Sequence, residues 1–429
     1  MRFLSWCVAG PLVAAASLVG CIEVSASGAG GHAGTASSST DASSTDASST
    51  VTSSSSGGPP IACASLTKAS DDVMIAEALS APAALTWFGD RFLASFTLQP
   101  PSPHTASGRA VGLSPSSAVL TPPGVIDYGL PTSDCFDPMT AVGPSGAVAV
   151  WSDRRDADYE IYASALDATG AKVGVDVRVT DAPEFSIYPV VAAQADGFVA
   201  AWQDGRDGAF QVYAQRVDGS AQLVGENVKI SNDTLPCESP TIAASPASVA
   251  IAYTRSDTFV RGLVLSVWKP DLSAALASVP VSSSQSEKGP PAIVWTGDRY
   301  VVAWDERGVG APGIYAASFT ADGAPLAPAT RVLDAGTHQL RYVSLAVVGD
   351  HVALAYASNQ DENQGYKVYA TLLRFDLASS APEVRVTSAP SDSVAPTLAV
   401  SASGDLGVLY RDERDGDQRV YFSALACTP

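Results

Sequence analysis

Short runs of β-branched, aromatic and alanine residues recur along the chain from residue 73 onward, and Asp-Gly, Gly or Asn-containing turns separate them. In one unit, Pro189–Ala193 and Phe198–Trp202 are joined by Asp196-Gly197, and the run Phe210–Val217 follows. Runs bounded in this way predict β-strands joined by tight turns. No window shows a sustained 3.6-residue apolar period of helix length, so we expect the globular part to be almost entirely β.

One large aromatic residue recurs in each unit at nearly constant spacing. The successive intervals are 55, 51, 51, 51, 52 and 54 residues. The seven anchors are Phe96, Trp151, Trp202, Tyr253, Trp304, Tyr356 and Tyr410. A repeat of about fifty residues that contains four short strands is typical of a β-propeller blade. The sequence therefore predicts an all-β, seven-bladed β-propeller with four-stranded blades, whose strands are labelled a to d from the central channel outward.

Two further positions keep the same register. A tyrosine stands eleven residues after the anchor in four units, and a proline stands thirteen or fourteen residues before it in six units. These residues are Tyr162, Tyr213, Tyr315 and Tyr421, and Pro82, Pro138, Pro189, Pro240, Pro291 and Pro396. A bulky residue repeated at one place in a strand packs between neighbouring blades, so we expect the anchors to be buried.

The two ends of the domain are expected to complete one blade together. The last unit ends at strand c, Tyr421–Leu425, whereas Val73–Leu79 stands where strand d stands in every other unit and has no unit of its own. We expect it to complete blade 7, which removes an open sheet edge. Cys63 and Cys427 lie just outside these two segments and are natural partners for a disulfide.

The other two cysteines of the globular part, Cys135 and Cys237, form a second candidate pair. Each stands three residues before a strand-a proline, and 102 residues separate them, which is two repeats. They could meet across the mouth of the central channel if their Cα atoms approach within about 7 Å. An even number of cysteines in an exported chain is consistent with two bridges.

The N-terminal segment reads as an export signal. An apolar stretch follows Arg2, contains Pro11, and ends at Leu18-Val19-Gly20-Cys21. This ending resembles the bacterial lipoprotein box. The resemblance implies a signal peptide over 1–20 and lipidation of Cys21 with acyl chains such as palmitate. Several acyl chains would anchor Cys21 stably in a bilayer. The alternative is an ordinary secretory signal with a chance cysteine.

The segment 21–60 is expected to be a disordered tether. From Ser25 to Pro60 it contains almost only Ser, Thr, Gly, Ala and Asp, which cannot form a core. The propeller would then occupy 61–429. Together with the lipoprotein box, this organisation predicts a lipid-anchored protein of the bacterial cell envelope. Ile22, rather than Asp, follows the cysteine, which favours the outer membrane.

Charge narrows the range of partners. Loss of Arg2 with the signal changes the net charge from −19 to −20, so we expect no nucleic-acid partner. We expect a monomer. The acidic balance favours solubility and allows a cation or a basic partner.

An acid and arginine cluster follows the anchor in four units, in the turn between strands b and c. Asp can hold such a turn by accepting backbone hydrogen bonds while Arg pairs with a nearby carboxylate. The functional alternative is a ring of charged groups on one face that binds calcium, a sugar acid or a partner protein. Asp153, Asp156 and Asp158 alone supply few of the oxygens that calcium needs. The ligand-face candidates are Asp153, Arg155, Asp204, Arg206, Glu306, Arg307, Asp412 and Arg414.

The repeat resembles those of exported bacterial β-propeller proteins over residues 73–427. The resemblance rests on Val199–Trp202, on Asp204 and Arg206 in the turn, and on Val212–Ala214. It implies architecture more than activity, because such repeats occur in scaffolds, adhesins and some glycosidases. The Ser-x-Asp-x-Gly-x-x-Trp box of sialidases is absent from the sequence.

Three functions follow as hypotheses. The first is a membrane-anchored, non-catalytic module that binds a protein or glycan partner, and the second is a glycoside hydrolase or lyase with carboxylates near the channel. The third is a purely structural envelope component. The four histidines are scattered and form no Ser-His-Asp or zinc pattern, so we expect no enzyme and no cofactor, with calcium as a weak alternative.

Overall fold

A computed structural model describes residues 63–76, 80–99, 105–116, 119, 126–130, 132–256, 261–282, 284–308, 310–361 and 365–428. These residues form thirty strands and no helix, as the sequence predicts. It follows that no helix in these ranges is long and apolar enough to cross a membrane. All of them belong to one compact unit, Thr45–Pro429. The expected signal peptide 1–20, Cys21 and the tether 21–60 lie outside the described residues.

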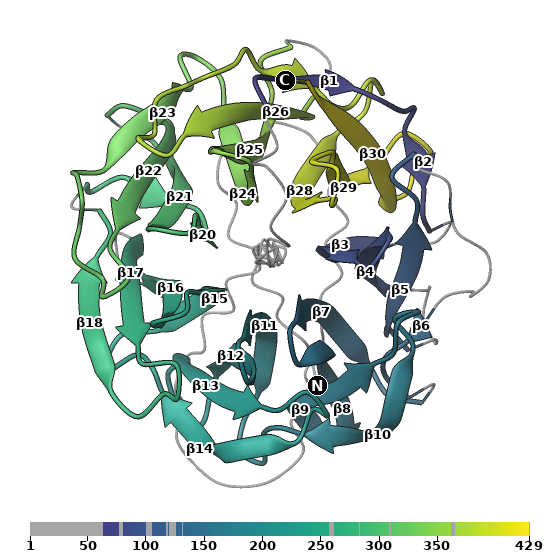
Figure 1. The fold of residues 1–429 in the computed structure, drawn as a ribbon, viewed down its shortest axis with the longest axis vertical. Coiled ribbons are helices and arrows are strands. Elements are labelled where there is room, and N and C mark those ends of the chain that lie inside the picture. The colour runs from purple at the N-terminus through teal and green to yellow at the C-terminus, as the bar shows by residue number, and fades with distance from the viewer. Residues whose placement is uncertain are drawn as a thin grey trace, which may run out of the picture. The chain divides into compact units, whose positions relative to one another are not determined.

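Seven antiparallel sheets stand around a ring, which confirms the predicted seven-bladed propeller (Figure 1). Blade 1 is β3 (Ser80–Phe88), β4 (Arg91–Leu98), β5 (Ser107–Leu113) and β6 (Ile126–Asp127). Blade 2 is β7 (Cys135–Gly143), β8 (Gly146–Asp156), β9 (Asp158–Leu166) and β10 (Lys172–Arg178). Blade 3 is β11 (Ser186–Gln194), β12 (Gly197–Asp204), β13 (Gln211–Val217) and β14 (Leu223–Lys229). Blade 4 is β15 (Cys237–Ala244), β16 (Val249–Ser256), β17 (Arg261–Trp268) and β18 (Ala275–Pro280).

The remaining three blades follow the same order. Blade 5 has a divided strand a, β19 (Glu287–Lys288) and β20 (Ala292–Trp295), followed by β21 (Tyr300–Arg307), β22 (Gly313–Phe319) and β23 (Thr330–Asp334). Blade 6 is β24 (Leu340–Val348), β25 (His351–Ser358), β26 (Lys367–Arg374) and β27 (Val384–Arg385). Blade 7 is β28 (Ser393–Val400), β29 (Leu406–Asp412) and β30 (Arg419–Thr428), completed by β1 (Ser65–Lys68) and β2 (Val73–Met74).

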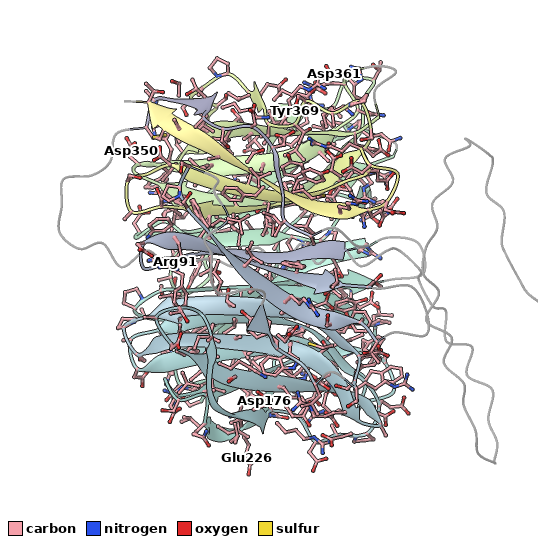
Figure 2. The ribbon with its side chains drawn as sticks, turned by 90° about the vertical axis from the view of Figure 1, so that its right-hand side faces the viewer. Arg91, Asp176, Glu226, Asp350, Asp361 and Tyr369 are labelled. Atoms are coloured by element: carbon pink, nitrogen blue, oxygen red, sulfur yellow. A yellow bond between two sulfur atoms is a disulfide. The ribbon has the colours of Figure 1, made fainter. Side chains whose placement is uncertain are left out.

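Strand a of each blade is innermost and strand d is outermost (Figure 1). Turns between strands a and b lie on one face of the ring, and turns between b and c lie on the other, which we call the b–c face. Figure 2 shows both faces edge-on: Asp350, in an a–b turn, lies at the left, and Asp361, just after strand b of blade 6, lies at the right. The loops that lead into strand a also reach the b–c face, because they bond to the b–c turns, as Gly205 N does to Phe185 O.

The aromatic anchors are buried between strands, as predicted. Trp151, Trp202 and Trp304 are 0% exposed, and Tyr356 and Tyr410 at most 1%. Four of the anchors stack on an aromatic residue of strand c, with ring centroids 5.9 to 6.3 Å apart. Burial of such large rings at one repeated position accounts for the constant period of the sequence.

Strand a carries a repeated irregularity that the sequence does not predict. Just before the proline position, one non-glycine residue has a positive φ, between 51° and 60°, and the register with strand b shifts there. The residues are Asp137, Tyr188, Ser239, Tyr342 and Ala395. We call this place the bulge position. A residue before proline usually adopts an extended conformation, so sequence rules favour a regular strand here.

The N-terminal residues complete blade 7. Val73 and Met74 of β2 pair with Phe422 and Tyr421 of β30, where strand d was expected. The closure also uses a segment that the sequence did not indicate. This segment is β1, which pairs with the last residues of β30, from Lys68 opposite Leu425 to Ser65 opposite Thr428. Glu77–Leu79, the end of the expected strand, lies outside the described residues.

A disulfide joins Cys63 and Cys427, as predicted, with Cα atoms 5.3 Å apart. The second candidate bridge does not form: Cys135 and Cys237 are free and buried. They begin β7 and β15, and the blade that starts with β11 stands between those strands. The Cys237 thiol instead faces the carbonyl of Leu235 (3.6 Å).

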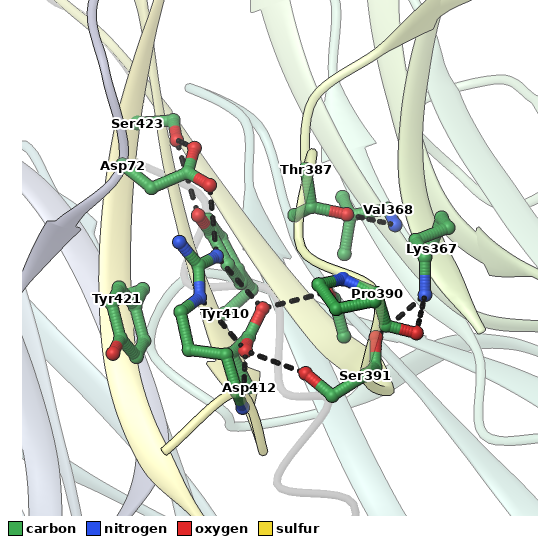
Figure 3. Close-up of polar contacts among 12 residues, drawn as sticks. Asp72, Lys367, Val368, Thr387, Pro390, Ser391, Tyr410, Asp412, Tyr421 and Ser423 are labelled. Carbon is green, nitrogen blue, oxygen red and sulfur yellow. Dashed lines mark hydrogen bonds and ion pairs between the residues drawn. The ribbon is translucent and has the colours of Figure 1, made fainter. Parts of the chain in front are cut away.

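Asp72, between β1 and β2, ties the two chain ends together (Figure 3). Its carboxylate accepts hydrogen bonds from Lys68 Nζ (2.5 Å), Ser423 Oγ (2.8 Å) and Arg414 Nη2 (2.8 Å). Burial alone would raise the pKa of Asp72, but these hydrogen bonds together lower it to about 2. Asp72 is therefore ionised at neutral pH, and it links the N-terminal segment to β30 and to the b–c turn of blade 7.

Candidate ligand-binding face

The b–c turn of blade 3 is organised by Asp204, whose side chain is 0% exposed. Its carboxylate accepts hydrogen bonds from Trp202 Nε1 (2.7 Å), Ser186 Oγ (3.1 Å) and the Arg206 amide (3.0 Å). The Arg206 guanidinium adds bonds from Nε and Nη2 at 2.7 Å each and lies 4.4 Å from the centre of the Tyr213 ring. A buried carboxylate needs several donors, and the anchor, strand a and the turn supply them.

Blades 2 and 7 repeat this arrangement. Asp153 accepts from Trp151 Nε1 (3.1 Å) and Arg155 Nη2 (2.6 Å). Asp412 accepts from Arg414 through both Nε and Nη2 at 2.9 Å. The acid and the arginine therefore form one recurring structural unit, which the tryptophan anchor joins in blades 2 and 3. In blade 7 the hydroxyl of the anchor Tyr410 pairs instead with Ser423 Oγ (3.2 Å).

Blade 5 varies the unit by one residue. Glu306 takes the acid's place, since it accepts from Trp304 Nε1 (2.9 Å) and Ser284 Oγ (2.6 Å). Arg307 pairs instead with Asp305 (2.6 Å), which is fully buried. Burial raises the pKa of Asp305, although Arg307 partly offsets that effect.

The structure thus places all eight ligand-face candidates on the b–c face, within four separate turns. The carboxylates of Asp153, Asp204 and Asp412 are 0% exposed, whereas the four arginine side chains are 15% to 23% exposed. The acids are satisfied inside their turns, which supports the structural interpretation for them. Contact of the four arginines with a ligand stays a prediction.

Blades 1, 4 and 6 lack the unit, as their sequences indicate, and blades 4 and 6 use other pairs. In blade 6, Tyr356 donates to Glu383, and Asp361 accepts from Tyr369 (2.7 Å) and pairs with Arg385 (2.7 Å). In blade 4, Arg255 bonds to Asp233 of the loop before strand a.

Within the described ranges, no group of three or more His, Cys, Asp or Glu is placed to hold a metal ion. Of the acids considered for calcium, Asp153 is held by Arg155, and Asp156 accepts from Tyr162. These two carboxylates are therefore used within blade 2.

Three other positions on the b–c face differ from blade to blade. The first is the residue of strand a just before the bulge position. The second stands in the chain three residues before the aromatic residue of strand c that stacks on the anchor. The third stands three residues before the bulge position of the following blade. In blade 2 these are Phe136, Tyr159 and Phe185, which we call the aromatic group. In blade 6 they are Arg341, Tyr366 and Asp392. Variation at fixed places on a constant frame is what a binding surface requires.

The aromatic group joins blades 2 and 3. The Tyr159 ring lies 5.8 Å from Phe136 and 5.7 Å from Phe185, edge-on to both. Phe136 and Phe185 are partly exposed, Tyr159 is 7% exposed, and the Arg154 guanidinium lies 5.7 Å from the centre of the Tyr159 ring. Blade 3 adds two partly exposed apolar residues at the equivalent first and second positions, Ile187 and Phe210.

A buried carboxyl group adjoins the aromatic group. Asp137 occupies the bulge position after Phe136 and is 9% exposed. Its amide donates to Thr97 Oγ1 of blade 1 (3.0 Å), but its carboxyl group has no hydrogen-bond partner among the described residues. Burial raises the pKa of Asp137 to about 7. Sequence reasoning missed this residue, because one Asp in a strand carries no signal of its own.

The equivalent group in blade 6 is polar. Arg341 donates from Nη2 to Gln339 Oε1 (2.8 Å), which also accepts from the Tyr366 hydroxyl (2.5 Å), and it lies 5.7 Å from the Tyr366 ring centre. The buried Nε of Arg341 has no partner in the described part of the chain. Asp392 accepts from the Tyr366 amide (2.7 Å).

Two fully buried lysines were also missed by sequence reasoning. Lys288 Nζ donates to the carbonyls of Ser284 (2.7 Å) and Ser286 (2.9 Å), and Lys367 Nζ to that of Ser391 (2.5 Å) among others (Figure 3). Burial lowers the pKa of both ammonium groups. Because each ammonium group donates to carbonyls of the loop before a strand a, both lysines stabilise the loops of the b–c face and are not candidates for ligand contact.

The architecture is also found in a solved structure of another protein. The phage phi92 endosialidase aligns with a TM-score of 0.52 at 10% identity, over 84% of this chain and 70% of that one. The likeness shows the propeller fold. An endo-arabinase from Bacteroides thetaiotaomicron (TM-score 0.37, 11% identity, 52% and 88% covered) and the Pyrococcus horikoshii acylaminoacyl peptidase (0.46, 8%, 82% and 53%) are more distant. No protein-family model matches the chain, and no curated protein matches it either.

Proposed function

We propose that this protein is a lipid-anchored cell-envelope protein whose propeller is a non-catalytic module that binds a protein or glycan partner on the b–c face. One observation carries the proposal. The Asp and Arg positions that repeat on this face are bonded within their turns, whereas two of the three neighbouring positions change from aromatic in blade 2 to charged in blade 6. A purely structural ring has no need of such variation.

A glycoside hydrolase is the alternative that Asp137 favours, since a carboxyl group with a pKa near 7 suits a general acid. Glycosidases of the common type need a second carboxylate. The acids nearest in sequence are already bonded, because Asp134 accepts from the Ala106 amide (2.9 Å) and Asp127 pairs with Arg109 (3.0 Å). Asp153 is held by Arg155. Binding without catalysis therefore fits the geometry better.

The lipid anchor can be tested separately from ligand binding. In a bacterial host that processes lipoproteins, wild-type protein should incorporate labelled palmitate and sediment with membranes. A Cys21→Ser variant should lose both properties, because the thiol that accepts the lipid is gone. Unchanged labelling of the variant would rule out Cys21 as the anchor.

The binding face can be tested by capture from solubilised envelope with the Cys21→Ser chain as bait. Phe136→Ala and Arg341→Ala each alter one variable position without touching a turn acid. Trp295→Ala is a matched control, because Trp295 is a partly exposed aromatic next to an a–b turn, on the opposite face. We expect the captured partner to be lost with at least one face variant and kept by the control. Capture that all three variants retain would remove the b–c face as the binding surface.

A further inference from the structure

The aromatic group presents ring faces and a polar edge together. Tyr159 is wedged edge-on between Phe136 and Phe185, so the two partly exposed rings have fixed positions rather than free rotation. Fixed aromatic side chains lose little conformational entropy when they contact a ligand. This part of the face is therefore ready to receive a flat, partly apolar surface.

The carboxyl group of Asp137 restricts what that surface can be. It lies next to Phe136 in the chain, and its charge contributes to a pKa of about 12 for Tyr159, after burial and Asp134. A wholly apolar occupant would remove the remaining water from Asp137 and leave it without a hydrogen-bond donor, which is costly. The occupant must therefore bring hydroxyl or amide donors at its edge.

Charge gives the next restriction. The chain has a net charge of −19, and Asp137 and Asp134 both lie beside the aromatic group, with Arg154 as the facing cation. The two carboxyl groups oppose the positive charge of Arg154, so the local charge gives an anionic group little attraction. An acidic polymer is thus disfavoured at this place.

We infer that the aromatic group binds a neutral hexopyranose residue of a glycan, with the C–H face of the sugar on the Phe136 and Phe185 rings and a sugar hydroxyl donating to Asp137. This inference rests on the proposed binding role of the b–c face and names the ligand class of that face. A pyranose ring combines an apolar face with hydroxyl donors around its edge. That combination matches two aromatic rings beside a buried acceptor.

The test uses affinity electrophoresis of the Cys21→Ser chain through gels that contain a neutral glucan, galactan or mannan. Polygalacturonate serves as the acidic comparison. Wild-type protein should be retarded by at least one neutral polysaccharide. Phe136→Ala and Phe185→Ala should each weaken that binding by tenfold or more, and Asp137→Asn by several-fold, while Trp295→Ala stays within twofold of wild type.

Saturation-transfer NMR with the monosaccharide of the retarding polymer supplies a second measurement. Signals should concentrate on the C–H protons of one sugar face and should be lost in Phe136→Ala. Each variant is compared with wild type by circular dichroism and thermal melting, so that misfolding is separated from loss of contact. Phe185→Leu, which keeps an apolar side chain of similar size, is used if Phe185→Ala fails to fold.

The outcomes separate the two proposals. Retardation that the Phe136 and Phe185 variants leave unchanged overturns the sugar site but not the binding role. Retardation by polygalacturonate alone also overturns the sugar site. Capture of a protein partner through Arg341, with no retardation by any neutral polysaccharide, overturns the sugar site and leaves the b–c face as a binding surface. No retardation by any polymer together with no captured partner overturns both.

Discussion

The turn acid of blade 3 is a hub that joins the anchor, strand a and the b–c turn. Asp204 accepts from Trp202, Ser186 and Arg206 while fully buried. The same residues could equally suggest a charged binding ring when read from the sequence, because sequence does not show which donors reach a carboxylate. Because the carboxylates of Asp153, Asp204 and Asp412 are buried, their role is to hold the turns rather than to bind a ligand.

Trp202→Phe tests the hub without emptying the core. The variant keeps most of the ring but removes the Nε1 donor to Asp204, so we expect a loss of about 1 to 3 kcal/mol in the free energy of unfolding. Trp202→Ala should cost about 3 to 5 kcal/mol. Urea unfolding measures both. A Trp202→Phe variant as stable as wild type would show that the indole bond contributes nothing.

Asp137 gives a pH dependence of stability with a definite sign. Its folded pKa of about 7 lies above the value near 4 of an unfolded Asp, so the folded state holds a proton that the unfolded state has lost. Stability from this group is full below about pH 4 and falls as pH rises toward about 7.

Asp137→Asn should remove that fall. We expect the variant to match wild type at pH 4 and to be more stable than wild type at pH 8, because Asn never acquires the buried charge. Unfolding free energies from urea titrations across this range are the measurement. A wild-type protein that loses no more stability than the variant between the two pH values would contradict the burial of Asp137.

At the scale of the strand, the sequence predicts where strand a lies but not its shape. The prolines mark the right place in six units, yet the residue before them is left-handed in four blades, and before Val343 in a fifth. The reason is visible in three dimensions: the amides of Asp137 and Ser239 at this position reach Thr97 and Gln203 of the preceding blade. A contact between blades overrides the local preference.

Ala395→Gly tests the strain at the bulge position. Glycine adopts a φ of +52° without a steric penalty, so we expect a gain of up to about 1 kcal/mol in stability. Ala399→Gly is the control in the same strand, where the backbone φ is not positive, and should lose about 1 kcal/mol. If thermal and urea unfolding show both changes to be equally destabilising, the bulge stores no strain.

The divided outer strand of blade 7 shows a second limit of sequence reading. Val73 and Met74 are recognisable as part of an apolar run, whereas Ser65–Lys68 has one large apolar residue among polar ones and does not stand out as a strand. Only Leu66 of β1 is buried, at 3% exposure. A strand that adds one buried side chain leaves almost no hydrophobic pattern to detect.

For the whole molecule, the fifty-residue period is sufficient to predict the ring and the number of blades, and the positions of Cys63 and Cys427 outside the closing segments predict the disulfide. Period and anchors survive because every blade repeats the same packing. The candidate site could not be predicted in this way, since Phe136, Tyr159 and Phe185 lie 49 residues apart in the chain from first to last and belong to no motif. Their proximity depends on how one blade meets the next.

The Cys63–Cys427 bridge closes a loop of 364 residues in sequence separation. Replacing both cysteines with serine should cost on the order of 5 kcal/mol as an upper figure, because the unfolded chain regains the entropy of an open loop. Melting temperatures of the double variant and of wild type, with and without reductant, measure this. Reductant should lower the melting temperature of wild type only, and an equal effect on both would show that the bridge does not act in closure.

Blade 7 contains both the first and the last residues of the described domain, so it cannot exist in a partly synthesised chain. Blades 1 to 6 each use consecutive residues and can form in order as the chain grows. β1 and β2 must wait for β30, which ends at Thr428. A chain that lacks even its last ten residues keeps an open sheet edge, two unpaired strands and a free Cys63. Closure of the ring therefore requires a chain that extends from β1 through β30.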